Sequence, residues 1–269
     1  MPAAADDAPA SMVDRLALAP VEADVFESVG VSRQRHLFGG LLLGQATHAA
    51  LLTVAPDRPA CALHASFVVA GNGTHPVRYE VERTRDGRIF STRRVVARQG
   101  HRVLLVATVD VQAGEGGAEY AAAAPVDVPP PEELRTGRYH SRWFESRDVR
   151  PVRGGAGPAP RRAWFRAQLP LPADAVLHQA ALAYLSDHGP TRAVREPHAG
   201  HPGMERRMSA SLDHAVWFHR AGRVDQWLLY ELVPMSTSNG RGLAIGTIHD
   251  QAGGLLATVA QEALLRLPG

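Results

Sequence analysis

Ser211-Leu-Asp-His-Ala-Val-Trp-Phe-His219 combines the alternation of a β-strand with a high density of polar groups. In a strand every second side chain points to the same face, and one such set here is Leu212, His214, Val216 and Phe218. Ser211 would then lie on the opposite face. A strand that only supports a fold seldom carries polar groups on both faces. We therefore expect this stretch to form one wall of a functional site.

The segments around this stretch predict more strands and one helix. Apolar alternation predicts strands at residues 142–149, 162–169, 227–233, 243–250 and 255–265, with a glycine-rich and proline-rich loop, PVRGGAGPAP, between the first two. The spacing of apolar residues predicts a helix over 175–187.

The first half of the chain has the same order of elements. Strand patterns begin at Val25 and cover residues 64–69, 77–83, 90–98 and 103–111, and LLLGQATHAALL predicts a buried helix that starts near Gly39 and Gly40. Tyr-Glu-Val at 79–81 matches Tyr-Glu-Leu at 230–232, an offset of 151, and Ala-Thr-Val at 107–109 recurs at 257–259, an offset of 150. This shared offset predicts an internal duplication.

The predicted fold class is therefore α+β, in which each half has one long helix wrapped by a curved antiparallel sheet. Residues 1–12 are rich in alanine, proline and aspartate and are expected to be disordered. The proline-rich segment 121–137 predicts a linker between a first domain at 13–120 and a second at 138–269.

Composition excludes several kinds of chemistry. The single cysteine, Cys61, cannot form an internal disulfide, and all 29 basic residues are arginines, so no lysine is present for a Schiff base or a Walker-type phosphate loop. A net charge of +2 with dispersed arginines argues against a nucleic-acid partner. The N-terminus has neither the basic start nor the apolar run of a secretory signal, and no stretch is long enough to span a bilayer, so we expect a cytoplasmic protein and no membrane partner.

Asp187 is a carboxylate in an unfavourable place. It falls in the last turn of the predicted helix, ahead of Gly189-Pro190, where the helix macrodipole disfavours negative charge, and it continues an apolar stripe. One interpretation is that it turns outward to water as the helix frays. The other is that partial burial raises its pKa until it can accept a proton from water.

Gln261 and Ser211 also allow two interpretations. Gln261 continues an apolar row of its strand, and could be a core amide that bonds to backbone or one that orients a polar reactant. Ser211 could cap a turn or hold a water. No GxSxG elbow supports it as a covalent nucleophile.

Several of these segments together resemble the acyl-CoA thioesterase II family, whose fold is a double hotdog. The matching segments are LAYLSDH, SLDHAVWFHR, QWLLYE and TVAQEALLR in the second half, with RHLFGGLLLGQA and DGRIFSTRRVVARQ in the first. The resemblance covers nearly all of residues 25–266. It places the family's active-site aspartate, hydroxyl residue and glutamine on Asp187, Ser211 and Gln261. Two departures are a serine at 211, where the bacterial archetype has threonine, and Ala260 before the glutamine, where it has valine.

The resemblance implies hydrolysis of an acyl-CoA thioester by an activated water, with no cofactor. We expect backbone N–H groups at Gly39 and Gly40 to stabilise the oxyanion, and Arg241 to meet the phosphates of the substrate. No metal is expected, because the histidines, including the loop pair His198 and His201, do not have ligand spacing. A homo-oligomer, either a dimer or a tetramer, is also expected from the resemblance.

Two other functions remain open at this point. A hotdog enoyl-CoA hydratase would use an Asp and His pair on a segment that is not recognisable here. The other is a catalytically weak acyl-CoA binding or scaffold protein, which would bind acyl-CoA without releasing thiol.

Overall fold

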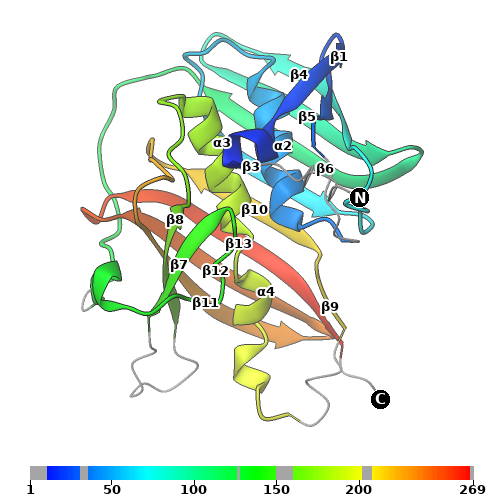
Figure 1. The fold of residues 1–269 in the computed structure, drawn as a ribbon. Helices are drawn as coiled ribbons and strands as arrows, with labels where there is room; N and C mark the ends of the chain where they lie inside the picture. The colour runs from blue at the N-terminus through cyan, green and yellow to red at the C-terminus, as the bar shows by residue number, and fades with distance from the viewer. Residues whose placement is uncertain (1–10, 31–35, 126–127, 150–159, 202–207, 267–269) are drawn as a thin grey trace, which may run out of the picture.

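The protein forms two successive sets of antiparallel strands, each with one long helix (Figure 1). The computed structural model describes residues 11–30, 36–125, 128–149, 160–201 and 208–266. The first set comprises α1 (Met12–Leu16), β1 (Leu18–Glu22), β2 (Val25–Ser28), α2 (Gly39–Leu51), β3 (Ala60–Phe67), β4 (Arg78–Asp86), β5 (Phe90–Gln99) and β6 (Arg102–Gln112).

The second set follows a short 3-10 turn, η1 (Pro131–Glu133). It comprises β7 (Phe144–Val149), β8 (Arg161–Ala167), α3 (Ala175–Ser186), α4 (Pro190–Ala193), η2 (Glu196–His198), β9 (Met208–Ser211), β10 (Asp213–Phe218), β11 (Leu228–Ser238), β12 (Arg241–Asp250) and β13 (Leu255–Arg266). The expected strands and both expected helices are present, with ends shifted by a few residues.

All the strands belong to one antiparallel sheet, which confirms the expected sheet type. Its order is β1-β2-β4-β5-β6-β3-β10-β13-β12-β11-β8-β7, with β9 paired to β13. The first six strands come from the first set, and β3 pairs with β10 to join them to the second. Counted inward from the two edges of the sheet, β4 and β11 are both the third strand. Tyr79 lies on β4 and Tyr230 on β11, as the matching tripeptides predict.

The two long helices are antiparallel and in close contact. A Cβ on Gly40 would lie 2.4 Å from the Tyr184 carbonyl oxygen, and one on Gly44 would lie 2.8 Å from the Ala180 carbonyl oxygen. A step of four residues forward along α2 therefore corresponds to a step of four residues backward along α3, as expected for antiparallel helices. The start of α2 lies beside the end of α3.

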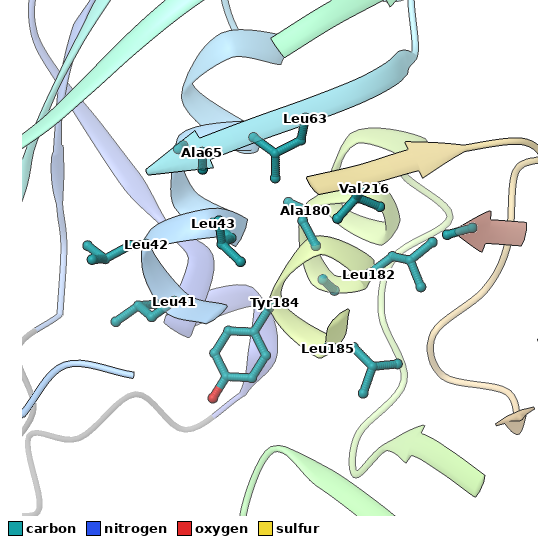
Figure 2. Close-up of a cluster of buried hydrophobic side chains, with 14 of the residues drawn as sticks. Leu41, Leu42, Leu43, Leu63, Ala65, Ala180, Leu182, Tyr184, Leu185 and Val216 are labelled. Atoms are coloured by element: carbon teal, nitrogen blue, oxygen red, sulfur yellow. The ribbon is translucent and has the colours of Figure 1, made fainter. Parts of the chain in front are cut away.

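A continuous apolar core surrounds these helices. Figure 2 shows Leu43 of α2, Leu63 of β3, and Ala180, Leu182 and Tyr184 of α3, with Val216 of β10 beside them. Eleven of the 13 residues of α2 and eight of the 12 residues of α3 are buried, so the buried residues surround most of each helix and do not form a single stripe. No helix in the described ranges is long and apolar enough to cross a membrane.

Three predictions need correction. Ser11 and Met12 are not disordered: Ser11 caps α1 in a capping box with Asp14, and Met12 is buried. The short elements α1, β1 and α4 carry too few residues for a periodic signal and were not predicted. Residues 1–10 and nearly all of the PVRGGAGPAP loop lie outside the described residues.

The third correction concerns residues 211–219, which do not form one regular strand. The pairing with β13 runs from Ser211 with Ala263 to Ala215 with Ala260, so four steps on one strand match three on the other. The extra residue is a β-bulge, and Leu212 separates β9 from β10. Because the bulge shifts the alternation by one, Ser211 and His214 share a face, contrary to prediction.

We predict that Gly44→Ala lowers the free energy of unfolding by about 1–3 kcal/mol, although alanine favours helices over glycine by roughly 1 kcal/mol. The added Cβ would lie 2.8 Å from the Ala180 carbonyl and 2.8 Å from Leu16, and the carbonyl cannot move without its helix. Chemical denaturation measures the change. Gly114→Ala is the matched control, since nothing lies within 4 Å of its Cβ. Equal stability of the two variants would contradict the close packing of the helices.

Candidate active site

Asp187 is buried at the junction of the two long helices. It directly follows α3 and serves as its C-cap, while Gly189, with φ of 113°, turns the chain into α4. Asp187 exposes only 9% of its surface, so it does not turn outward to water. A carboxylate at this end of α3 is disfavoured by that helix's own dipole.

The start of α2 supplies the compensating partner. A Cβ on Gly39 would lie 2.7 Å from Asp187 Oδ2, and the backbone N–H of Gly40 forms a hydrogen bond to the Asp187 carboxylate. Phe38, the N-cap, provides no side-chain cap. The free N–H groups of α2 are thus aimed at Asp187, and glycine at position 39 is needed for the carboxylate to approach.

Ser211 and Gln261 complete a cluster with Asp187. Gln261 lies in the middle of β13, is fully buried, and donates from Nε2 to Ser211 Oγ at 2.8 Å. Ser211 Oγ in turn lies 3.5 Å from Asp187 Oδ1, toward which its hydroxyl points. Ser211 is the partly exposed member of the three and therefore faces the approach from solvent.

Two further polar residues contact this cluster, and a third contacts one of these two. Gln261 Oε1 accepts from His214 Nδ1 at 2.5 Å, and His214 Nε2 lies 2.7 Å from Ser186 Oγ. Gln261 Nε2 also lies 3.2 Å from Thr191 Oγ1 on α4. Thr191 and Ser186 gave no signal in the sequence, because no pattern in their segments points to Gln261 or His214.

Burial controls the charge states of the cluster. It raises the pKa of Asp187 from 3.8 to about 7, although hydrogen bonds from Gly40, Gln261 and Ser211 act in the opposite direction. Burial also lowers the pKa of His214 and His188 to about 4, so both imidazoles are neutral at pH 7. Asp187 is thus the group whose proton affinity matches neutral pH.

Arg241 does not join this cluster. It begins β12, is about half exposed, and forms an ion pair with Glu262 at 2.9 Å. Among its contacts in the described residues, none involves Asp187, Ser211 or Gln261. Its expected contact with a phosphate remains a prediction.

A cavity of about 630 Å³ lies elsewhere, at the opposite end of α3. Its lining includes Ala175 and His178 of α3, Cys61 and Arg220, and none of the three clustered residues. The cluster is therefore our candidate active site in preference to this cavity, because the raised pKa, the hydroxyl and the amide converge there.

Comparisons with known proteins find relatives that match most of this chain. Residues 136–264 match the family model described as acyl-CoA thioesterase, and residues 29–112 match that of the acyl-CoA thioesterase N-terminal domain. The acyl-CoA thioesterase 2 of Haemophilus influenzae is 32% identical over 252 residues, which cover 86% of this chain and 88% of the relative. The human acyl-coenzyme A thioesterase 8 is 31% identical and covers 94% of this chain and 88% of its own.

Solved structures give the same result. The crystal structure of acyl-CoA thioesterase II TesB2 from Mycobacterium marinum has a TM-score of 0.85 and 37% identity, and the match covers 96% of this chain and 99% of that one. A conserved protein with a hot dog fold from Alicyclobacillus acidocaldarius has a TM-score of 0.78 at 23% identity, covering 96% of this chain and 98% of that one, a likeness of fold alone. The chain described here belongs to the acyl-CoA thioesterase family.

Proposed function

We propose that this protein hydrolyses acyl-CoA thioesters to a free fatty acid and CoA, using a water held by Asp187, Ser211 and Gln261. The observation that carries the proposal is the buried Asp187 carboxyl, whose pKa is raised to about 7 beside a hydroxyl and an amide. A carboxylate with that pKa can take a proton from an attacking water at neutral pH.

The reaction proceeds by addition and elimination. Ionised Asp187 accepts a proton from the water as its oxygen bonds to the thioester carbonyl carbon, while the Ser211 hydroxyl and the Gln261 amide orient that water. The tetrahedral intermediate then collapses, the C–S bond breaks, and the CoA sulfur leaves with the electron pair. Since a thiol has a pKa near 8.5, the thiolate leaves readily and takes its proton from Asp187 or solvent.

The developing oxyanion needs a donor near the start of α2. Gly39 and Gly40 are our candidates because their side-chain-free backbone lies at the positive end of the α2 dipole. The Gly40 N–H already has the Asp187 carboxylate as a partner, which favours Gly39 for the oxyanion.

The two alternative functions differ from hydrolysis in the reaction that they would catalyse. A hotdog hydratase would add water across a carbon–carbon double bond, and the neutral His214 bonded to Ser186 and Gln261 is not available to act as its histidine. A scaffold protein would bind acyl-CoA without liberating thiol, and would not need a carboxyl poised near pH 7.

We further propose two tandem hotdog units at 13–120 and 138–269, joined by 121–137. The repeated strand order on either side of the β3 and β10 pair supports this division. A homo-oligomer that buries exposed sheet faces, a cytoplasmic location and a contact of Arg241 with substrate phosphates complete the proposal.

Free thiol released from a panel of acyl-CoA esters tests the activity. We expect release by the wild type, and we expect Asp187→Asn to lower kcat by at least about 10²-fold, because the amide cannot accept the proton. Asp57→Asn on the surface is the matched control and should keep the wild-type rate. Binding of the esters without thiol release would favour the scaffold function, and an active Asp187→Asn variant would exclude Asp187 as the base.

We predict that kcat/KM rises with pH through about 7 and levels off above it. The base must be ionised, and the raised pKa of Asp187 places its ionisation there. Initial rates from pH 5 to 9 with a thiol reagent suited to low pH check this. A rate that is constant over this range, or that falls as pH increases, would contradict the role of Asp187.

Asp187 should also reduce stability at high pH. Because its folded pKa is about 7 and its reference value is 3.8, the folded state binds the proton more tightly, so stability falls as pH rises between these values. At 1.36 kcal/mol per pH unit, the limit is about 4 kcal/mol. Asp187→Asn should therefore be more stable than the wild type at pH 8 and nearly equal at pH 4, as measured by urea denaturation. An equal difference at both pH values would indicate that burial does not perturb this carboxyl.

A further inference from the structure

His214 lies behind Gln261, away from Asp187, and it makes two hydrogen bonds. It exposes 1% of its surface, and its two ring nitrogens contact Gln261 Oε1 at 2.5 Å and Ser186 Oγ at 2.7 Å. It contacts neither Ser211 nor Asp187 in the described residues, so it cannot transfer a proton to the reacting water directly. Its effect must pass through Gln261.

The amide of Gln261 has two possible orientations. With Nε2 toward Ser211, the amide donates to Ser211 Oγ, and the Ser211 hydroxyl is free to donate to Asp187. With the amide reversed, its oxygen would face Ser211, and the hydroxyl would donate to Gln261 and no longer toward Asp187. Only the first orientation directs the hydroxyl and amide donors toward the carboxylate.

The tautomer of His214 decides between these orientations. A neutral imidazole has one N–H, so if Nδ1 carries it, Gln261 Oε1 must face His214. Nε2 is then an acceptor, and Ser186 Oγ must donate to it. If Nε2 carries the proton, the Ser186 hydroxyl turns to the Ala183 carbonyl, which lies 2.8 Å away, and the bare Nδ1 repels Oε1.

We infer that His214 is a positioning residue that, with Ser186 donating to Nε2, uses its Nδ1–H to hold the Gln261 amide in the orientation required at Ser211 and Asp187. This inference rests on the proposed function of the cluster. One chain of donors then runs from Ser186 through His214, Gln261 and Ser211 to Asp187, and each group has its proton on the side facing the next.

Thr191 and Tyr230 support this chain at Gln261 and at Ser186. Thr191 Oγ1 lies 3.2 Å from Gln261 Nε2 and accepts the second amide hydrogen, so both hydrogens of the amide have a partner in this orientation. The Tyr230 hydroxyl donates to the Ser186 carbonyl at 2.7 Å and holds the end of α3 against β11. The arrangement therefore depends on contacts from α3, α4, β10, β11 and β13.

Two amide substitutions separate the nitrogens of His214. His214→Asn can place an NH2 near the position of Nδ1 and keep the donor to Gln261, whereas His214→Gln reaches the position of Nε2 and loses it. We expect His214→Gln to lower kcat by about 10²-fold with KM changed less than about threefold, and His214→Asn to lose less than about tenfold. Thermal unfolding of both variants shows whether each is folded.

The pH profile gives a readout that a purely structural role would not change. The hydrogen bond from the Ser211 hydroxyl lowers the pKa of Asp187. Reversal of the Gln261 amide in His214→Gln would turn that hydroxyl away from Asp187, so the midpoint of the kcat/KM profile should move to higher pH. In His214→Asn the midpoint should stay near that of the wild type. Equal losses of kcat and an unmoved midpoint in both variants would overturn the inference.

The tautomer can be observed without any substrate. We expect ¹⁵N NMR of the ring nitrogens to show Nδ1 protonated in the wild type, and Ser186→Ala to reduce that preference. Protonation at Nε2 in the wild type would overturn the inference even if the enzyme hydrolyses acyl-CoA. A wild type without thioesterase activity but with Nδ1 protonated would instead refute the proposed function.

Discussion

The structure depends on placing one carboxylate, that of Asp187, where the end of α3 meets the start of α2. The end of its own helix repels it electrostatically, and burial deprives it of water. The start of α2 offsets part of both costs, because the Gly40 N–H donates to the carboxylate and the absence of a side chain at Gly39 allows the approach. The part of the cost that is not offset raises the pKa of Asp187 to about 7, the value that the proposed general base requires.

This balance explains why the two long helices are antiparallel and so close. Glycines at positions 40 and 44 let α2 approach the backbone of α3 to distances that any Cβ would prevent. The same contact brings the positive end of one dipole beside the negative end of the other. Packing and electrostatics therefore favour the same arrangement, and the site lies at the point where both act.

The β-bulge at Leu212 is the second geometric requirement. In a regular strand Ser211 and His214 would point to opposite faces, and only one of them could reach Gln261. With one extra residue opposite β13, the serine reaches the Gln261 amide from one side and the histidine from the other. Asp213 secures the bulge, since its side chain accepts from the Glu262 backbone N–H at 2.8 Å.

Much of the fold and the three clustered residues could be predicted from the sequence. The long apolar helices and the period-two strands gave strong local signals, and Asp187 and Gln261 were identified because each interrupts an apolar pattern. The bulge could not be predicted, because a single extra residue is visible only against the partner strand. Thr191 contacts Gln261, which lies 70 positions away in the sequence, and Ser186 contacts His214, which lies 28 positions away. No local sequence pattern encodes contacts over such separations.

The two halves of the chain differ at the positions that form the cluster. Corresponding tripeptides on β6 and β13 align Val111 with Gln261, and the C-cap of α2 is the exposed Leu52 where that of α3 is Asp187. The first half therefore lacks the amide and the carboxylate and cannot hold a water in the same way. It still supplies the start of α2, whose Gly40 N–H is the backbone donor to the Asp187 carboxylate among the described residues. Neither half contains all the groups of the proposed site, so the proposed mechanism requires the contact between α2 and α3 and not the second half alone.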